Sequence, residues 1–167
     1  MDAIKRRYYQ CFSGSNLGID YYNISYFSEW ANAYAVVAIE DNTHVYHDGT
    51  LTATLNNAGE VYYKTTEIDM TGAHIASDKP VALFLVNNTT TIPVGYAYNS
   101  SLFQQLAPVH TWGKTFFVPV SHRTKDIVRI VASENNTNIT QTGGTLLFPA
   151  GGQTSLDNLQ AGQFVEL

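Results

Sequence analysis

The sequence has 167 residues and a formal net charge of −5, with 14% charged and 13% aromatic residues. A chain of this length buries roughly two thirds of its unfolded surface, so we expect a single domain that folds without a disulfide or a metal. The acidic balance argues against nucleic-acid binding, because the one basic cluster is Lys5-Arg6-Arg7. No apolar run approaches the roughly 18 residues that a membrane span needs, so membrane insertion is not expected.

The first 33 residues are rich in aromatic side chains. Aromatic residues at strand spacing commonly pack into a core, yet Tyr and Trp also offer large amphipathic contact areas to a sugar ring or a protein. Both interpretations stay open for this segment. If it binds a partner, the candidate binding residues are Tyr21, Tyr22, Tyr26 and Trp30.

Two apolar runs, 34–39 and 81–86, predict central strands that are covered on both faces. Pro80 opens the second run, where the loss of a backbone N–H is tolerated. Between the runs, Asp48-Gly49 predicts a two-residue hairpin, because both central residues of a type I′ turn need a positive φ.

The segment Ser101–Leu106 predicts a short helix, with Ser100 or Ser101 as its cap and Pro108 forcing its end. Alternating apolar residues then predict two consecutive strands, 116–120 and 128–132, joined by a polar loop. Elsewhere, short strands alternate with turns that contain Gly, Asn or Pro.

The chain contains an internal repeat. The run Val37–Val45 returns as Val131–Ile139 with an offset of 94 residues (132 − 38 = 94), and Ala58-Gly59 returns as Ala161-Gly162 with an offset of 103 (161 − 58 = 103). The acidic residues at the start of each copy, Glu40-Asp41 and Glu134, indicate either turns that bind their own backbone or oxygen ligands for calcium.

These patterns predict an all-β fold, an antiparallel β-sandwich built from two repeated β-units, with a β-propeller fragment as the alternative. The expected organisation is one all-β domain over residues 1–167, with an N-terminal segment 1–33 that completes the sheet, unit 1 at 34–86, connecting strands and a short helix at 87–126, and unit 2 at 127–167. Unit 2 lacks a counterpart of the strand 81–86. Because an unpaired apolar edge favours association, residues 1–30, another chain or a further domain is expected to cover it.

The residue patterns give no catalytic site, and neither a metal nor a cofactor is expected. His44 and His47 lie three apart on a predicted strand, so their side chains point to opposite faces. Ser13 to Gly18 lacks the order of a nucleophile elbow. Cys11 is the only cysteine, which excludes an internal disulfide.

Three motifs resemble the IgGFc-binding protein N-terminal domain family over roughly residues 34–167. They are Ser77-Asp78-Lys79-Pro80-Val81-Ala82, the stretch Leu106–Pro119 with His110-Thr111-Trp112-Gly113-Lys114 at its centre, and Arg129–Thr137. The resemblance implies a β-rich module of mucosal, secreted or bacterial surface proteins that acts in adhesion and binding. It supplies no catalytic residues.

The leading hypothesis is a non-enzymatic, extracellular or cell-surface module that binds a glycan or glycoprotein. The rival is a structural protein, such as a surface-layer or virion-associated component, that pairs with other chains through open sheet edges and forms a homo-oligomer. An enzyme such as a glycosidase ranks third, because it needs two carboxylates in one cleft.

Overall fold

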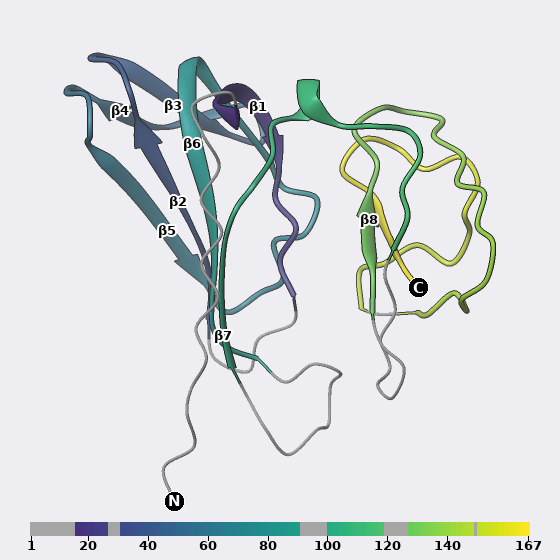
Figure 1. The fold of residues 1–167 in the computed structure, drawn as a ribbon. Coiled ribbons are helices and arrows are strands. Elements are labelled where there is room, and N and C mark those ends of the chain that lie inside the picture. The colour runs from purple at the N-terminus through teal and green to yellow at the C-terminus, as the bar shows by residue number, and fades with distance from the viewer. Residues whose placement is uncertain (1–15, 27–30, 91–99, 119–126, 149) are drawn as a thin grey trace, which may run out of the picture.

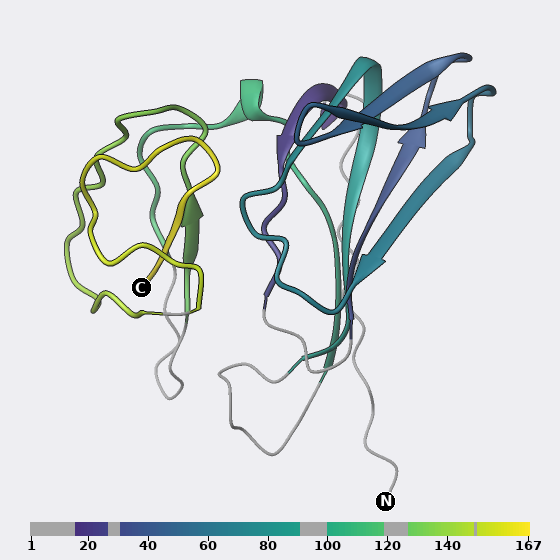
Figure 2. The ribbon, with the colours of Figure 1, turned by 180° about the vertical axis from the view of Figure 1, so that it is seen from behind.

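The computed structural model describes residues 16–26, 31–90, 100–118, 127–148 and 150–167, which form two lobes side by side (Figures 1 and 2). The first lobe is a seven-stranded sheet, and the C-terminal lobe, residues 127–167, contains a two-stranded sheet. All pairings of the described strands are antiparallel, so the predicted all-β antiparallel fold is confirmed. The elements are β1 (Gly18–Tyr22), β2 (Asn32–Ala38), β3 (Thr43–His47), β4 (Thr50–Leu55), β5 (Val61–Thr66), β6 (His74–Thr90), β7 (Ser100–Gln105), the 3₁₀ turn η2 (Val109–Thr111), β8 (Arg129–Val131) and β9 (Phe164–Glu166).

The 17-residue strand β6 is the centre of the first lobe. Its N-terminal part pairs with β3 on one edge and β1 on the other, while its C-terminal part pairs with β2 and β7. Pro80 lies near the junction between the two parts, where a missing N–H costs little. The N-terminal segment thus contributes β1 to the sheet.

The sheet nearly closes on itself. Its strands run in the order β4-β3-β6-β2-β5, and the hydroxyls of Thr52 on β4 and Tyr62 on β5 lie 3.0 Å apart across the remaining gap. Inward side chains from every second position fill the interior because successive residues of a strand face opposite sides. The largest fully buried apolar members are Tyr21, Tyr34, Val36, Val45, Ile75, Val81 and Leu83.

The predicted hairpin at Asp48-Gly49 is confirmed. The two residues join β3 to β4 with φ of 48° and 76°, as a type I′ turn requires. The Asp48 carboxylate also accepts a hydrogen bond of 2.8 Å from the backbone N–H of His74. The turn is therefore fixed to the start of β6 as well as by its own geometry.

The predicted helix at Ser101–Leu106 is wrong, because Ser100–Gln105 forms strand β7. An isolated helix this short is marginal. Pairing with β6 provides ladder hydrogen bonds, and the rings of Phe103 and Phe84 stack with centroids 5.4 Å apart. Tertiary pairing therefore overrides the local preference.

The predicted strand at 116–120 is wrong over its described part, because residues 116–118 lie outside any strand and are exposed. Residues 119–120 lie outside the described ranges. The next predicted strand, 128–132, appears as β8, but its partner is β9 near the end of the sequence. β8 therefore pairs within the C-terminal lobe, and not with residues 116–118.

The same turn structure occurs in both copies of the repeat. Gly59 donates its N–H to the carbonyl of Ala38, and Gly162 donates to that of Ala132, both at 2.8 Å. Asp41 and Asn135 occupy equivalent positions, and each side chain accepts the N–H of the equivalent alanine, Ala58 at 2.7 Å or Ala161 at 3.0 Å. The division of the chain into units 34–86 and 127–167 stays a prediction.

Within the described ranges, the chain has no helix with the length and apolarity required to traverse a lipid bilayer.

Candidate functional site

The outward side chains of β5 begin an exposed apolar surface. Tyr62 and Lys64 are half-buried, whereas Val61 and Tyr63, which alternate with them along the strand, are 53% and 56% exposed. This alternation follows from the period of two residues along a strand. A large exposed aromatic side chain beside an exposed aliphatic one is typical of a contact surface.

The surface continues across the next strands. Residues paired across a sheet share a face, so Tyr63 is followed by Ala35 on β2 and then by Phe84 on β6. Phe84 in turn stacks on Phe103 of β7. We name this set the outer apolar face: Ala35, Val37, Val61, Tyr63, Phe84 and Phe103.

Sequence reasoning missed this face. The runs 34–39 and 81–86 predict strands covered on both sides, but Ala35, Val37 and Phe84 are only half-buried. The prediction that both faces are buried is therefore correct for the inward residues of these strands and wrong for Ala35, Val37 and Phe84. The available signal was Val61-Tyr62-Tyr63-Lys64, whose alternation marks a strand with one exposed face.

Tyr21, a predicted binding residue, lies in the core. Its side chain is fully buried, and its hydroxyl donates a hydrogen bond of 2.7 Å to the carbonyl of Val81. Burial raises the pKa of Tyr21 to about 12 and outweighs the opposing effect of the hydrogen bond with the Gly18 backbone. The phenol therefore has no exposed surface for a partner.

Tyr22 and Tyr26, two further predicted binding residues, lie toward the C-terminal lobe. Tyr22 is half-buried, with its ring 5.0 Å from His74 and 6.2 Å from Trp112, centroid to centroid. Tyr26 packs against the guanidinium of Arg129. Trp30 lies outside the described residues. The structure thus places Tyr22 and Tyr26 at the contact between the lobes, away from the outer apolar face, and a binding role for them stays a prediction.

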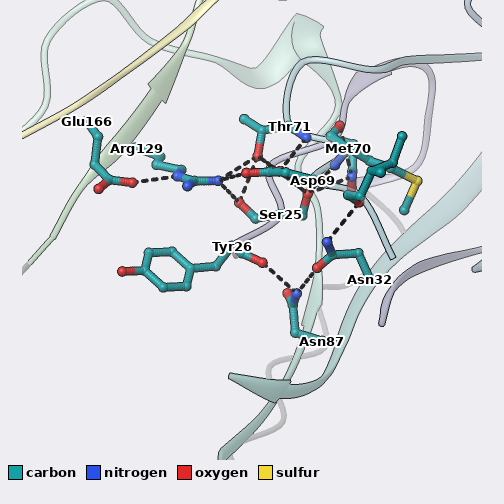
Figure 3. A network of polar contacts seen from close by, with 11 residues as sticks. Ser25, Tyr26, Asn32, Asp69, Met70, Thr71, Asn87, Arg129 and Glu166 are labelled. Atoms are coloured by element: carbon teal, nitrogen blue, oxygen red, sulfur yellow. Dashed lines mark hydrogen bonds and ion pairs between the residues drawn. The ribbon is translucent and has the colours of Figure 1, made fainter. Parts of the chain in front are cut away.

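Arg129 on β8 connects the lobes through a buried polar network (Figure 3). Its side chain is 6% exposed. The Nε atom donates to Glu166 of its own lobe at 2.7 Å. The Nη1 atom donates to Asp69, to the carbonyl of Ser25 and to the hydroxyl of Thr71, at 2.6, 2.7 and 2.9 Å. One guanidinium therefore fixes three groups of the first lobe.

Two aromatic rings contact the same guanidinium. The Cζ atom of Arg129 lies 5.0 Å from the ring centroid of Tyr26 and 4.9 Å from that of Phe164. Contacts of this kind stabilise a cation by roughly 0.5 to 2 kcal/mol each, more when water is excluded. The planar Arg side chain suits such a site because it forms hydrogen bonds at its edge while rings cover its faces.

Hydrogen bonds from a neighbouring residue keep Asp69 ionised for its ion pair with Arg129. Its carboxylate accepts hydrogen bonds from the backbone N–H and the hydroxyl of Thr71, at 2.9 and 2.7 Å. Burial alone raises the pKa of this carboxyl, but the Thr71 hydrogen bonds and then the Arg129 charge outweigh burial and lower the pKa below its ordinary value of 3.8. Asp69 is thus held as a carboxylate.

We expect Asp69 to make stability depend on pH in the acid range. A carboxyl whose pKa is lowered by folding stabilises the folded state above its unfolded pKa, 3.8, and loses this effect as pH falls through its folded pKa. The difference in unfolding free energy between the wild type and Asp69→Asn, from urea denaturation, should therefore be largest at pH 6 and shrink toward pH 3. A difference that stays constant over this range would contradict the assignment.

The acidic positions at the repeat turns act on the backbone. Thr43 donates its hydroxyl to the carbonyl of Glu40, and Thr137 donates to that of Glu134, at 2.8 and 2.7 Å. Together with the Asp41 contact to Ala58, these bonds are those that the turn interpretation predicts, and in them Glu40 and Glu134 act through their main-chain carbonyls. In the ranges that the structure describes, no three His, Cys, Asp or Glu residues are grouped as metal ligands.

Comparison with known proteins gives one finding. A family model described as IgGFc binding protein matches residues 11–167, nearly the whole chain. No curated protein and no solved structure matches it.

Proposed function

The chain belongs to the IgGFc-binding protein family, and from this premise we propose that it is a non-catalytic, extracellular binding module that recognises a glycoprotein through the outer apolar face. Membership of a family of binding modules supports binding as the general role. The exposure of Val61 and Tyr63 on a continuous apolar surface is the observation that supports this location.

The chemistry of the face suits a large partner. Aromatic and aliphatic side chains on rigid strands lose little conformational entropy on contact, and a Tyr residue presents both an apolar ring and a hydroxyl. Tyr63 and Val61 lie on neighbouring outward positions of one strand, with Ala35 and Val37 opposite them. Such a surface can cover a peptide segment or the apolar side of a sugar ring.

Binding to an immobilised mucin-type glycoprotein tests the proposal. We expect Tyr63→Ser to weaken binding about fivefold or more, as loss of a central aromatic contact does. Thr65→Ser is the matched control, because Thr65 is the next outward residue of the same strand and is also exposed. Circular dichroism should show both variants folded.

Three outcomes oppose the proposal. No binding to the glycoprotein, with or without its glycans, would exclude this class of ligand. Binding that Tyr63→Ser leaves unchanged would exclude the outer apolar face. A stable homo-oligomer in light scattering, lost in Tyr63→Ser, would instead assign the face to self-association.

A further inference from the structure

The ladder between β8 and β9 has the register of the ladder between β2 and β5. In the first lobe Val37 pairs with Val61, and in the C-terminal lobe Val131 pairs with Phe164. The offsets are 94 (131 − 37) and 103 (164 − 61), the same as those of the sequence repeat. The two strand pairs and the turns between them are therefore equivalent, position by position.

The two units differ on the opposite edge of the first strand. In unit 1, β2 lies between β5 and β6, and its residues from Asn32 to Ala38 pair with β6. In unit 2, β8 pairs with β9, and no other described strand lies against it. In the part of the chain that the structure describes, unit 2 thus has the equivalents of β2 and β5 without an equivalent of β6.

Equivalent core residues of the two units differ in how deeply they are buried. Val36 and Val45 of unit 1 are fully buried, each at 0% exposure. Their equivalents, Ile130 and Ile139 (36 + 94 and 45 + 94), are only partly buried and lie at the margin of the small core around Leu159. Among the described residues, the core of unit 2 is therefore less fully covered at the place where β6 covers unit 1.

The backbone of β8 has N–H and C=O groups that point away from β9 and could pair with another strand. Val128 and Ala132 bond toward β9, so the alternating residues Arg129 and Val131 direct their N–H and C=O groups to the opposite edge. Among the described residues, no backbone hydrogen bond reaches these groups. The Arg129 side chain is held in the network between the lobes, so it places no free charge on this edge.

We propose that this edge of β8 is a strand-acceptor site, which binds an extended apolar segment of another polypeptide antiparallel to β8. The proposal rests on the function as a binding module and names a second contact beyond the outer apolar face. Addition of a strand to a sheet edge gives affinity through main-chain bonds and specificity through alternate side chains.

Unit 1 defines the chemistry of the accepted segment. There, Leu83 lies opposite Val36 and points into the core, and Ala82 lies opposite Val37. The accepted segment therefore has a large aliphatic residue opposite Ile130 and a small residue opposite Val131. A folded copy of this chain cannot supply its own β6, because that strand already pairs on both edges. The donor is thus a segment of a different protein that is free of its own sheet.

Amide hydrogen exchange by NMR on the full 167-residue chain tests the site. The probe is a synthetic peptide with the sequence of residues 79–88, Lys-Pro-Val-Ala-Leu-Phe-Leu-Val-Asn-Asn, extended by two lysines for solubility. We expect the amides of Arg129 and Val131 to exchange rapidly in the chain alone and to slow by at least about tenfold with peptide. The Ile130 amide should be protected in both states. The same peptide with Leu83→Asp should give no protection.

Several results would overturn the proposal. Protection of Arg129 and Val131 before the peptide is added would show that the edge is occupied. Rapid exchange that persists at saturating peptide, or equal protection by the Leu83→Asp peptide, would exclude the stated segment. Protection that grows with protein concentration alone would assign the edge to a second copy. Because Tyr63→Ser leaves β8 intact, that variant should bind the peptide normally, which separates this site from the outer apolar face.

Discussion

Replacing Arg129 by Met is expected to destabilise the folded chain by about 3 kcal/mol or more, because it leaves two partly or fully buried carboxylates without their cation. The side chains of Asp69 and Glu166 are 21% and 9% exposed, and Arg129 forms an ion pair with each. The substitution also removes the donors to Ser25 and Thr71. Urea denaturation at pH 7, followed by circular dichroism and Trp fluorescence, measures the change in unfolding free energy.

A neutralised variant separates the charge effect from the loss of packing. In Arg129→Met/Asp69→Asn/Glu166→Gln no carboxylate remains to be compensated, so we expect much of the stability lost in the single variant to return. Equal destabilisation in both would show that shape and hydrogen bonds dominate. A cost below about 1 kcal/mol in Arg129→Met would mean that the network contributes no more than an exposed ion pair.

Features set by neighbouring residues could be predicted from the sequence. The hairpin at Asp48-Gly49 depends on two residues that tolerate a positive φ, and the strands containing Tyr34 and Leu83 depend on local apolar runs. The recurring turns were visible as a repeat because their hydrogen bonds use the same residue types, such as Thr43 and Thr137. Local chemistry determines each of these features.

Features that depend on distant residues could not be predicted. Arg129 meets Ser25 across 104 positions and Asp69 across 60, and neither spacing leaves a periodic signal. The segment Ser100–Gln105 has helix-compatible residues and becomes a strand because β6 offers an edge to it. The outer apolar face was missed for a related reason, since an uninterrupted apolar run does not reveal which of its two faces is covered.

Gly72→Ala is expected to force the lobes apart locally. Gly72 has φ of +89°, and a Cβ atom there would lie 1.9 Å from the carbonyl oxygen of Gly162. The obstacle is backbone, so no side chain can rotate away from it. The positive φ alone costs roughly 1 to 2 kcal/mol for an alanine, and the steric conflict adds a similar or larger amount. Urea denaturation measures the total, and hydrogen exchange around Gly162 reports where the structure loosens.

Gly59→Ala is the matched control for this effect. Gly59 has nearly the same φ, +84°, but nothing lies within 4 Å of its would-be Cβ. Its substitution therefore adds the conformational cost without the collision, and we expect the cost of Gly72→Ala to exceed that of Gly59→Ala by at least about 1 kcal/mol. Equal costs would mean that the backbones of the two lobes do not meet at Gly72 in solution. A larger cost confined to Gly72, with faster exchange of the Gly162 amide, would establish that this close approach helps to hold the C-terminal lobe against the sheet.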